Sequence, residues 1–64
     1  MDRAMWQRHL AVAERHVARQ RQIVAELEQG GYDATMPRAL LMQLEATLKL
    51  YIEDRDRLQA DLSQ

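Results

Sequence analysis

One short segment near the middle of the chain, residues 30–37, contains both glycines and the only proline of the 64-residue sequence. Glycine adopts the backbone conformations that end helices, and proline is tolerated in a helix only within its first turn. The long stretches on either side contain neither residue type. The segment therefore predicts a single turn between two helical arms of nearly equal length.

The first arm, from about residue 2 to residue 29, shows the alternating four- and three-residue spacing of a helical seam. The seam positions are Trp6, Leu10, Ala13, Val17, Gln20, Val24 and Leu27. A second row beside the seam holds Met5, His9, Val12, His16 and Ile23. Together the two rows are wider than the contact between two helices requires, which favours a bundle of four helices.

The second arm, from about residue 36 to residue 62, repeats the spacing. Its seam positions are Leu41, Leu44, Leu48, Tyr51, Arg55, Leu58 and Leu62. Pairing the two seams about a turn at about residues 30–35 predicts opposed pairs, among them Leu27–Leu41, Gln20–Leu48, Val17–Tyr51, Ala13–Arg55 and Trp6–Leu62. We expect Gly30 or Gly31 to end the first helix. Thr35 is the preferred cap of the second helix, with Asp33 as the alternative.

These patterns predict an all-α fold, an antiparallel two-helix hairpin formed by residues 1–64 as one domain. A core in so short a chain rarely supplies more than about 3–5 kcal/mol of stability. The sequence has no cysteine, so no disulfide can add to it. We therefore expect stability to come from association, with two hairpins forming a homodimeric four-helix bundle.

Composition argues against several classes of function. The net charge of −1 offers no general attraction for nucleic acid or for an anionic membrane. No apolar run approaches the roughly 20 residues that span a bilayer, and the first residues lack the apolar core of a signal peptide, so we expect a cytoplasmic protein. No nucleophile–base pair, phosphate loop or metal-ligand spacing is present. We expect neither an enzyme nor a bound cofactor or metal.

Six residues at seam or near-seam positions are candidates for specifying the core or the dimer. They are Trp6, His9, His16, Gln20, Tyr51 and Arg55. The two histidines are either spacers within the apolar sector or part of a metal or pH-sensing site formed across a dimer. Arg55 either fixes the register by pairing with Glu14, Asp54 or a second chain, or extends along Ala13 to the surface. Gln20 has a similar register role or faces water.

A second group of residues lies outside the seams and offers surfaces for partners. Met42 and Leu50 are apolar positions away from the predicted core, while Arg8, Arg15 and Arg19 gather on the polar face of the first helix. The first function that these features suggest is a small structural or protein-interaction module. The alternative is a regulatory RNA-binding bundle that uses the three arginines.

Nearly the whole chain resembles a set of very short, uncharacterised bacterial helical-hairpin proteins. The resemblance rests on the run from Ala13 to Gln22, the turn Gly31-Tyr32-Asp33-Ala34-Thr35, and the stretch Asp54-Arg55-Asp56-Arg57-Leu58. Tyr32 stands where that set commonly has histidine, and Pro37-Arg38 where it commonly has an acidic capping residue. The resemblance implies a hairpin and no chemistry. In architecture alone, the chain is also similar to Rop, the small RNA-binding protein of plasmid copy control, which dimerises into a four-helix bundle.

Overall fold

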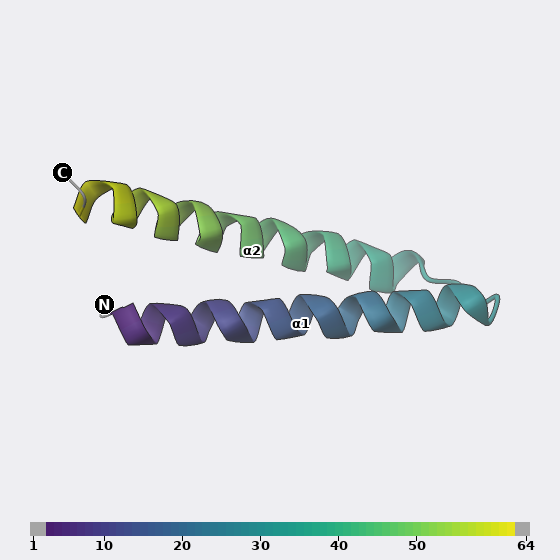
Figure 1. Cartoon of the computed structure of the whole chain (residues 1–64). Coiled ribbons are helices and arrows are strands. Elements are labelled where there is room, and N and C mark those ends of the chain that lie inside the picture. The colour runs from purple at the N-terminus through teal and green to yellow at the C-terminus, as the bar shows by residue number, and fades with distance from the viewer. Residues whose placement is uncertain (1–2, 63–64) are drawn as a thin grey trace.

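The chain forms an all-α antiparallel hairpin, as the sequence predicts. A computed structural model describes residues 3–62, with α1 spanning Arg3–Gln29 and α2 spanning Thr35–Leu62 (Figure 1). The expected first helical residue, at position 2, lies outside the described residues. The hairpin is a rod with extents of 52 × 16 × 14 Å. Its helices lie closest near the turn and diverge toward the two termini, which lie at the same end (Figure 1).

The end of α1 is a glycine cap stabilised by two backbone hydrogen bonds. The Tyr32 N–H donates to the Leu27 carbonyl at 2.9 Å, and the Gly31 N–H donates to the Glu28 carbonyl at 3.1 Å. This pair of bonds defines a Schellman motif, in which the residue after the cap is left-handed. Gly31 has a φ of 75° and fills that position. The cap satisfies carbonyls that would otherwise lack partners at the helix end.

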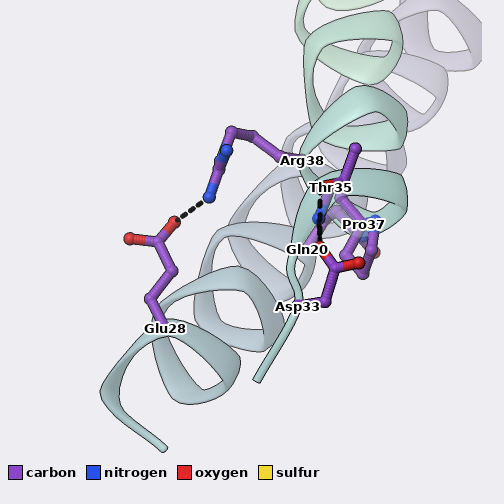
Figure 2. Close-up of polar contacts among 6 residues, drawn as sticks. All are labelled: Gln20, Glu28, Asp33, Thr35, Pro37 and Arg38. Carbon is purple, nitrogen blue, oxygen red and sulfur yellow. Dashed lines mark hydrogen bonds and ion pairs between the residues drawn. The ribbon is translucent and has the colours of Figure 1, made fainter. Parts of the chain in front are cut away.

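The Asp33 side chain accepts hydrogen bonds from the first residue of α2 (Figure 2). Its Oδ1 accepts hydrogen bonds from the Thr35 N–H at 3.0 Å and from the Thr35 hydroxyl at 2.6 Å. The predicted preference for Thr35 as the cap is therefore wrong, because Thr35 is itself the first helical residue and Asp33 satisfies its amide. The first backbone bond of the helix runs from the Arg38 N–H to the Ala34 carbonyl, so Pro37 lies where no N–H is needed.

The seam of α1 forms the core of the hairpin. Leu10, Val17, Gln20 and Val24 are buried, while the remaining seam residues of α1 are partly covered. No residue of α2, which lies wholly within the described range, is fully buried. A single partner helix covers one side of α2 only. Most of the second helix therefore stays accessible in the isolated hairpin.

The register of the two helices differs from the predicted one. Trp6 packs edge to face on Tyr51, with ring centroids 5.8 Å apart, instead of facing Leu62. Gln20 donates a hydrogen bond to the Pro37 carbonyl. Each of these partners lies about three helical turns nearer the hairpin turn than the predicted one.

Burial shows how far the helices are displaced. Ala34 is only 2% exposed although it precedes α2, and Leu62 is 84% exposed. Sliding α2 toward the turn by about one heptad, or about 10 Å, places Ala34 opposite Leu27 and leaves Leu58 and Leu62 beyond the covered part of α1. It also places Arg55 opposite Trp6 instead of Ala13. A displacement of about one heptad lies between the eleven-residue offset of the Trp6 and Gln20 contacts and the two-residue offset of the interhelical ion pairs, whose long side chains reach along the rod.

The short turn explains this displacement. Only residues 30–34 separate the two helices. In the predicted register, with Leu27 opposite Leu41, α2 would begin about one helical turn beyond the end of α1. The glycine cap instead returns the chain beside the last turn of α1, and the seam of α2 then begins at Ala34 and Pro37. Continuing the seam spacing from Leu41 toward the turn, by four and then by three residues, reaches Pro37 and Ala34. The predicted register started the seam at Leu41 and so missed these two positions.

Candidate interaction surface

Two ion pairs show which sides of the helices face the same way. Arg21 pairs with Glu45 at 3.7 Å, and Arg38 pairs with Glu28 at 3.4 Å (the second pair is drawn in Figure 2). At 3.6 residues per turn, Arg21 and Glu28 lie on one flank of the α1 seam, as do Arg38 and Glu45 on α2. One long side of the hairpin is therefore charged. All four side chains are largely exposed, so each pair adds little stability.

The opposite long side of the hairpin carries several exposed apolar side chains. The flank of α1 away from Arg21 and the flank of α2 away from Glu45 must share this side, because the ion pairs fix the other. The apolar residues there, called the apolar band from here on, are Met5, Val12, Ile23, Met36 and Leu40. Ile23 is half-buried and the other four are exposed, Leu40 to 46%. Both helices thus contribute apolar side chains to this side, which also carries His9 and His16 on α1 and Thr47 and Asp54 on α2.

The exposed area of the chain is large for its length. The hairpin has 5351 Å² of accessible surface, whereas a compact monomer of this size has about 4,200 Å². Its radius of gyration is 15.1 Å, against about 11 Å for a compact domain of this length. The excess is about 1,100 Å² per chain. Two chains covering that area would bury about 2,200 Å², which lies within the range of obligate homodimers.

His9 and His16 are exposed and lie in the same sector of α1 as the apolar band. They interrupt its apolar character near Val12. Within residues 3–62, no group of three or more histidine, cysteine, aspartate or glutamate side chains is arranged to hold a metal ion. The structure therefore places the histidines on the same side of α1 as the apolar band, and within residues 3–62 it brings no third ligand to them.

Trp6 and Tyr51 close the open end of the hairpin. Both rings are partly covered, and their edge-to-face contact is a favourable arrangement of the ring quadrupoles. The Trp6 indole N–H is inaccessible to solvent and has no acceptor among the described residues. Leaving such a donor without a partner costs about 1–3 kcal/mol. The contact stabilises the end of the rod where the helices diverge.

Gln20 is buried inside the hairpin. Its Nε2 donates to the Pro37 carbonyl at 3.0 Å, which links the middle of α1 to the first turn of α2 (Figure 2). A buried amide is tolerated only when it is hydrogen-bonded. Any sliding of α2 would break this bond. Gln20 therefore has the position and the partner that a residue fixing the register needs.

Arg55 pairs with a neighbour in the sequence. Its Nε and one terminal nitrogen each lie 3.3 Å from Asp56 Oδ1. The expected partners Glu14 and Asp54 are not the ones used, since Asp54 pairs with Arg57 at 3.7 Å. Both ion pairs are local to α2, where they leave the contact between the helices unchanged.

Of the residues proposed from the sequence as partner-binding, Met42, Arg8 and Arg15 lie away from the apolar band. Leu50 lies on the same face of α2 as Met36, and Arg19 lies on the same face of α1 as Val12. Met42 and Leu50 point away from α1 and are 69% and 59% exposed. Arg8, Arg15 and Arg19 are exposed on α1, and within residues 3–62 no carboxylate pairs with them. The side of the rod that carries Arg21 has an open groove of about 380 Å³, lined by Arg21, Glu45, Leu48, Lys49, Ile52 and Glu53. The groove is lined by both basic and acidic side chains, so it does not favour a ligand of either charge.

Comparison with protein-family models, with curated proteins and with solved structures finds no match. The hairpin fold that the resemblance to short bacterial proteins implied is present, and the resemblance transfers nothing more. Neither described helix is long and apolar enough to cross a membrane. The surfaces of the hairpin itself are therefore the only guide to its function.

Proposed function

We propose that the chain is a small non-enzymatic structural or protein-interaction module that acts as a homodimeric four-helix bundle. The observation that carries this proposal is the apolar band, which lies on one side of the rod and draws on both helices. Each leucine or valine moved from water into a bundle core contributes about 1.5–3 kcal/mol. Packing the bands of two hairpins together supplies the second apolar layer that each chain lacks.

The bundle leaves a defined set of side chains available to a further protein. Met42 and Leu50 lie on the outer surface of α2, and Arg8, Arg15 and Arg19 lie along the outer face of α1. Covering the apolar band leaves Met42, Arg8 and Arg15 accessible, whereas Leu50 and Arg19 lie on the same faces as Met36 and Val12 of the band. The accessible side chains form the surface through which the module contacts other proteins.

Charge substitutions at two nearby residues of α2 test the proposal. Leu40 is in the apolar band and Met42 is outside it, and both are exposed, so neither substitution disturbs the core of the single hairpin. We expect the natural protein and Met42→Glu to sediment as dimers at micromolar concentration. Leu40→Glu should sediment as a single chain, because the carboxylate would be desolvated in the interface. A single-chain mass for the natural protein, or equal weakening by both substitutions, would contradict the dimer.

The alternative function is a regulatory RNA-binding bundle similar in architecture to Rop. It is favoured by Arg8, Arg15 and Arg19, which lie close together around α1 without carboxylate partners in the described chain. Binding that falls steeply with salt and is lost in the triple alanine variant would support it. Absence of RNA binding at low salt would eliminate it, and the dimer would be unaffected.

A further inference from the structure

We infer that α1 binds an acidic helix of a different protein through Arg8, Arg15 and Arg19. This inference rests on the proposed function as a protein-interaction module and adds the chemistry of the partner. The three arginines, called the arginine row from here on, are exposed and lie within about 40° of one another around the helix. They gather three positive charges on one face of a chain whose net charge is −1.

The arginine row lacks the carboxylate partners that other arginines of the hairpin have. A carboxylate oxygen lies 3.3 to 3.7 Å from each of Arg21, Arg38, Arg55 and Arg57. Side chains three and four residues apart are neighbours on a helix. Besides one another, the neighbours of the row at this spacing are Ala4, Met5, Ala11, Val12, His16, Ala18, Gln22 and Ile23. None of these side chains is acidic.

The other carboxylates of α1 are also placed away from the arginine row. Glu26 is on the same face but lies seven residues beyond Arg19, about 10 Å along the axis, and it accepts a hydrogen bond from Gln22 at 3.3 Å. Glu14 lies about 100° around the helix from Arg15. The row itself is nearly opposite the buried Val17, so it faces away from α2. A carboxylate for the row must therefore come from another molecule.

The spacing of the arginine row fits a helix lying alongside α1. Arg8 and Arg15 are separated by seven residues, about 10 Å, and Arg19 follows after four more, about 6 Å. A partner helix has the same rise per residue, so carboxylates separated by seven and four residues would meet all three arginines together. The planar guanidinium group binds a carboxylate through two parallel hydrogen bonds. The row therefore matches an acidic helix in both charge and spacing.

The chain itself does not carry the matching pattern. Its sequence has no set of three aspartates or glutamates separated by seven and four residues, in either order. A helix of a second copy laid along the row would therefore leave an arginine unpaired. Of the row, only Arg19 borders the apolar band, beside Val12. The row thus favours a different protein over a second copy of this chain.

The aromatic residues favour a protein over RNA as the anionic partner. Aromatic side chains commonly hold single-stranded RNA by stacking on its bases. The aromatic residues of the chain are one tryptophan and two tyrosines. Trp6 packs on Tyr51, and Tyr32 lies in the turn beyond the end of α1. The row therefore has no aromatic side chain beside it, whereas its guanidinium groups are all that an acidic helix needs.

Two labelled helical peptides test the inference. Both contain about 20 residues of the same alanine, glutamine and glutamate composition. The matched peptide has three glutamates separated by seven and four residues, and the scrambled peptide has them on different faces. At low salt we expect the matched peptide to bind the natural protein about fivefold more tightly than the scrambled one, because only the matched peptide reaches all three arginines.

Two double variants show whether the arginine row is the binding site. Arg8→Gln with Arg15→Gln should weaken binding of the matched peptide about fivefold. Arg21→Gln with Arg38→Gln removes the same charge from arginines that already have partners, and it should leave binding nearly unchanged. Equal binding of the two peptides, equal weakening by the two variants, or no binding at low salt would overturn the inference.

Two further measurements on the same samples complete the test. Tighter binding of a single-stranded RNA with the same number of charges, lost in Arg8→Gln with Arg15→Gln, would assign the row to nucleic acid and overturn the acidic helix. Sedimentation separates the partner from the dimer. A dimer mass without peptide binding overturns the partner alone, and a single-chain mass with peptide binding retained overturns the dimer alone.

Discussion

At the scale of single residues, the turn is specified by local chemistry. Gly31 adopts a φ of 75°, which other residues reach only at a cost of about 1–2 kcal/mol. Gly30 lies under the Tyr32 ring, because a Cβ on Gly30 would come within 2.7 Å of the Tyr32 ring. Asp33 then satisfies the first amide of α2. These residues act through contacts with near neighbours in the chain, which explains why the turn is readable from the sequence.

The Asp33 carboxylate should make the stability of the hairpin depend on pH. Hydrogen bonds from the Thr35 hydroxyl and the Thr35 N–H, helped by the charge of Arg38, lower the pKa of Asp33 below its ordinary value of 3.8. A carboxyl whose pKa is lower in the folded state stabilises the fold above its unfolded pKa. That contribution is lost as pH falls through the lower, folded pKa. We expect acid to destabilise the natural protein more than Asp33→Asn.

Thermal unfolding of both proteins between about pH 6 and about pH 2 measures the difference, since the other carboxylates titrate equally in each. Asparagine keeps an oxygen that accepts the Thr35 amide but carries no charge, so Asp33→Asn is a matched control. If the two midpoints fall in parallel over this range, Asp33 does not contribute as described.

At the scale of the helices, the seams determine which face of each helix points inward. The turn determines how the two helices are aligned along their length. A slide of seven residues is nearly two complete turns, so it returns the same face of α2 to α1. The seam of α2 therefore points inward in both the predicted and the observed register. What differs is its ends, where Ala34 is covered and Leu62 is not. The bond from Gln20 to Pro37 holds α2 in the observed position.

Two leucine substitutions test the register. Leu10→Ala removes a buried side chain and should lower the free energy of unfolding by about 2–3 kcal/mol. Leu62→Ala changes an exposed side chain beyond the covered part of α1, so we expect an effect below about 0.5 kcal/mol. Urea denaturation at fixed protein concentration measures both. Comparable losses would show that Leu62 lies in the core, as the leucine pairing first suggested.

At the scale of the whole molecule, the hairpin is a single layer of two helices that leaves apolar side chains uncovered. Its charged side carries the ion pairs, its opposite side carries the apolar band, and α2 has no fully buried residue in the described structure. A two-helix rod offers each helix only one neighbour. The area that the rod leaves exposed is what motivates the proposed second copy.

Stability should accordingly rise with protein concentration. Association stabilises the folded chain by mass action, so the midpoint of thermal unfolding should increase by several degrees between about 5 and about 500 μM. Leu40→Glu should show a lower midpoint that does not change with concentration. Calorimetry of both proteins over this range provides the measurement. A constant midpoint for the natural protein, equal to that of Leu40→Glu, would argue against coupling between folding and association.

The sequence alone determined the two helices, the turn between them and the face that each helix turns inward. Those features follow from backbone preferences and from 3.6-residue periodicity, which act within a few residues. The sequence also identified the break at residues 30–37 and the second apolar row of α1. It could not rank Asp33 above Thr35 as the cap, because both residue types suit that role.

The tertiary structure decided the register and the gathering of the apolar flanks on one side. Registers one heptad apart keep every seam residue inward, so the apolar pattern does not distinguish them. The choice depends on how five turn residues return the chain, on the Gln20 bond and on the Trp6–Tyr51 contact. The ion pairs between the helices then fix which flanks lie together. These are contacts between residues distant in the chain, and each depends on where the turn places the second helix.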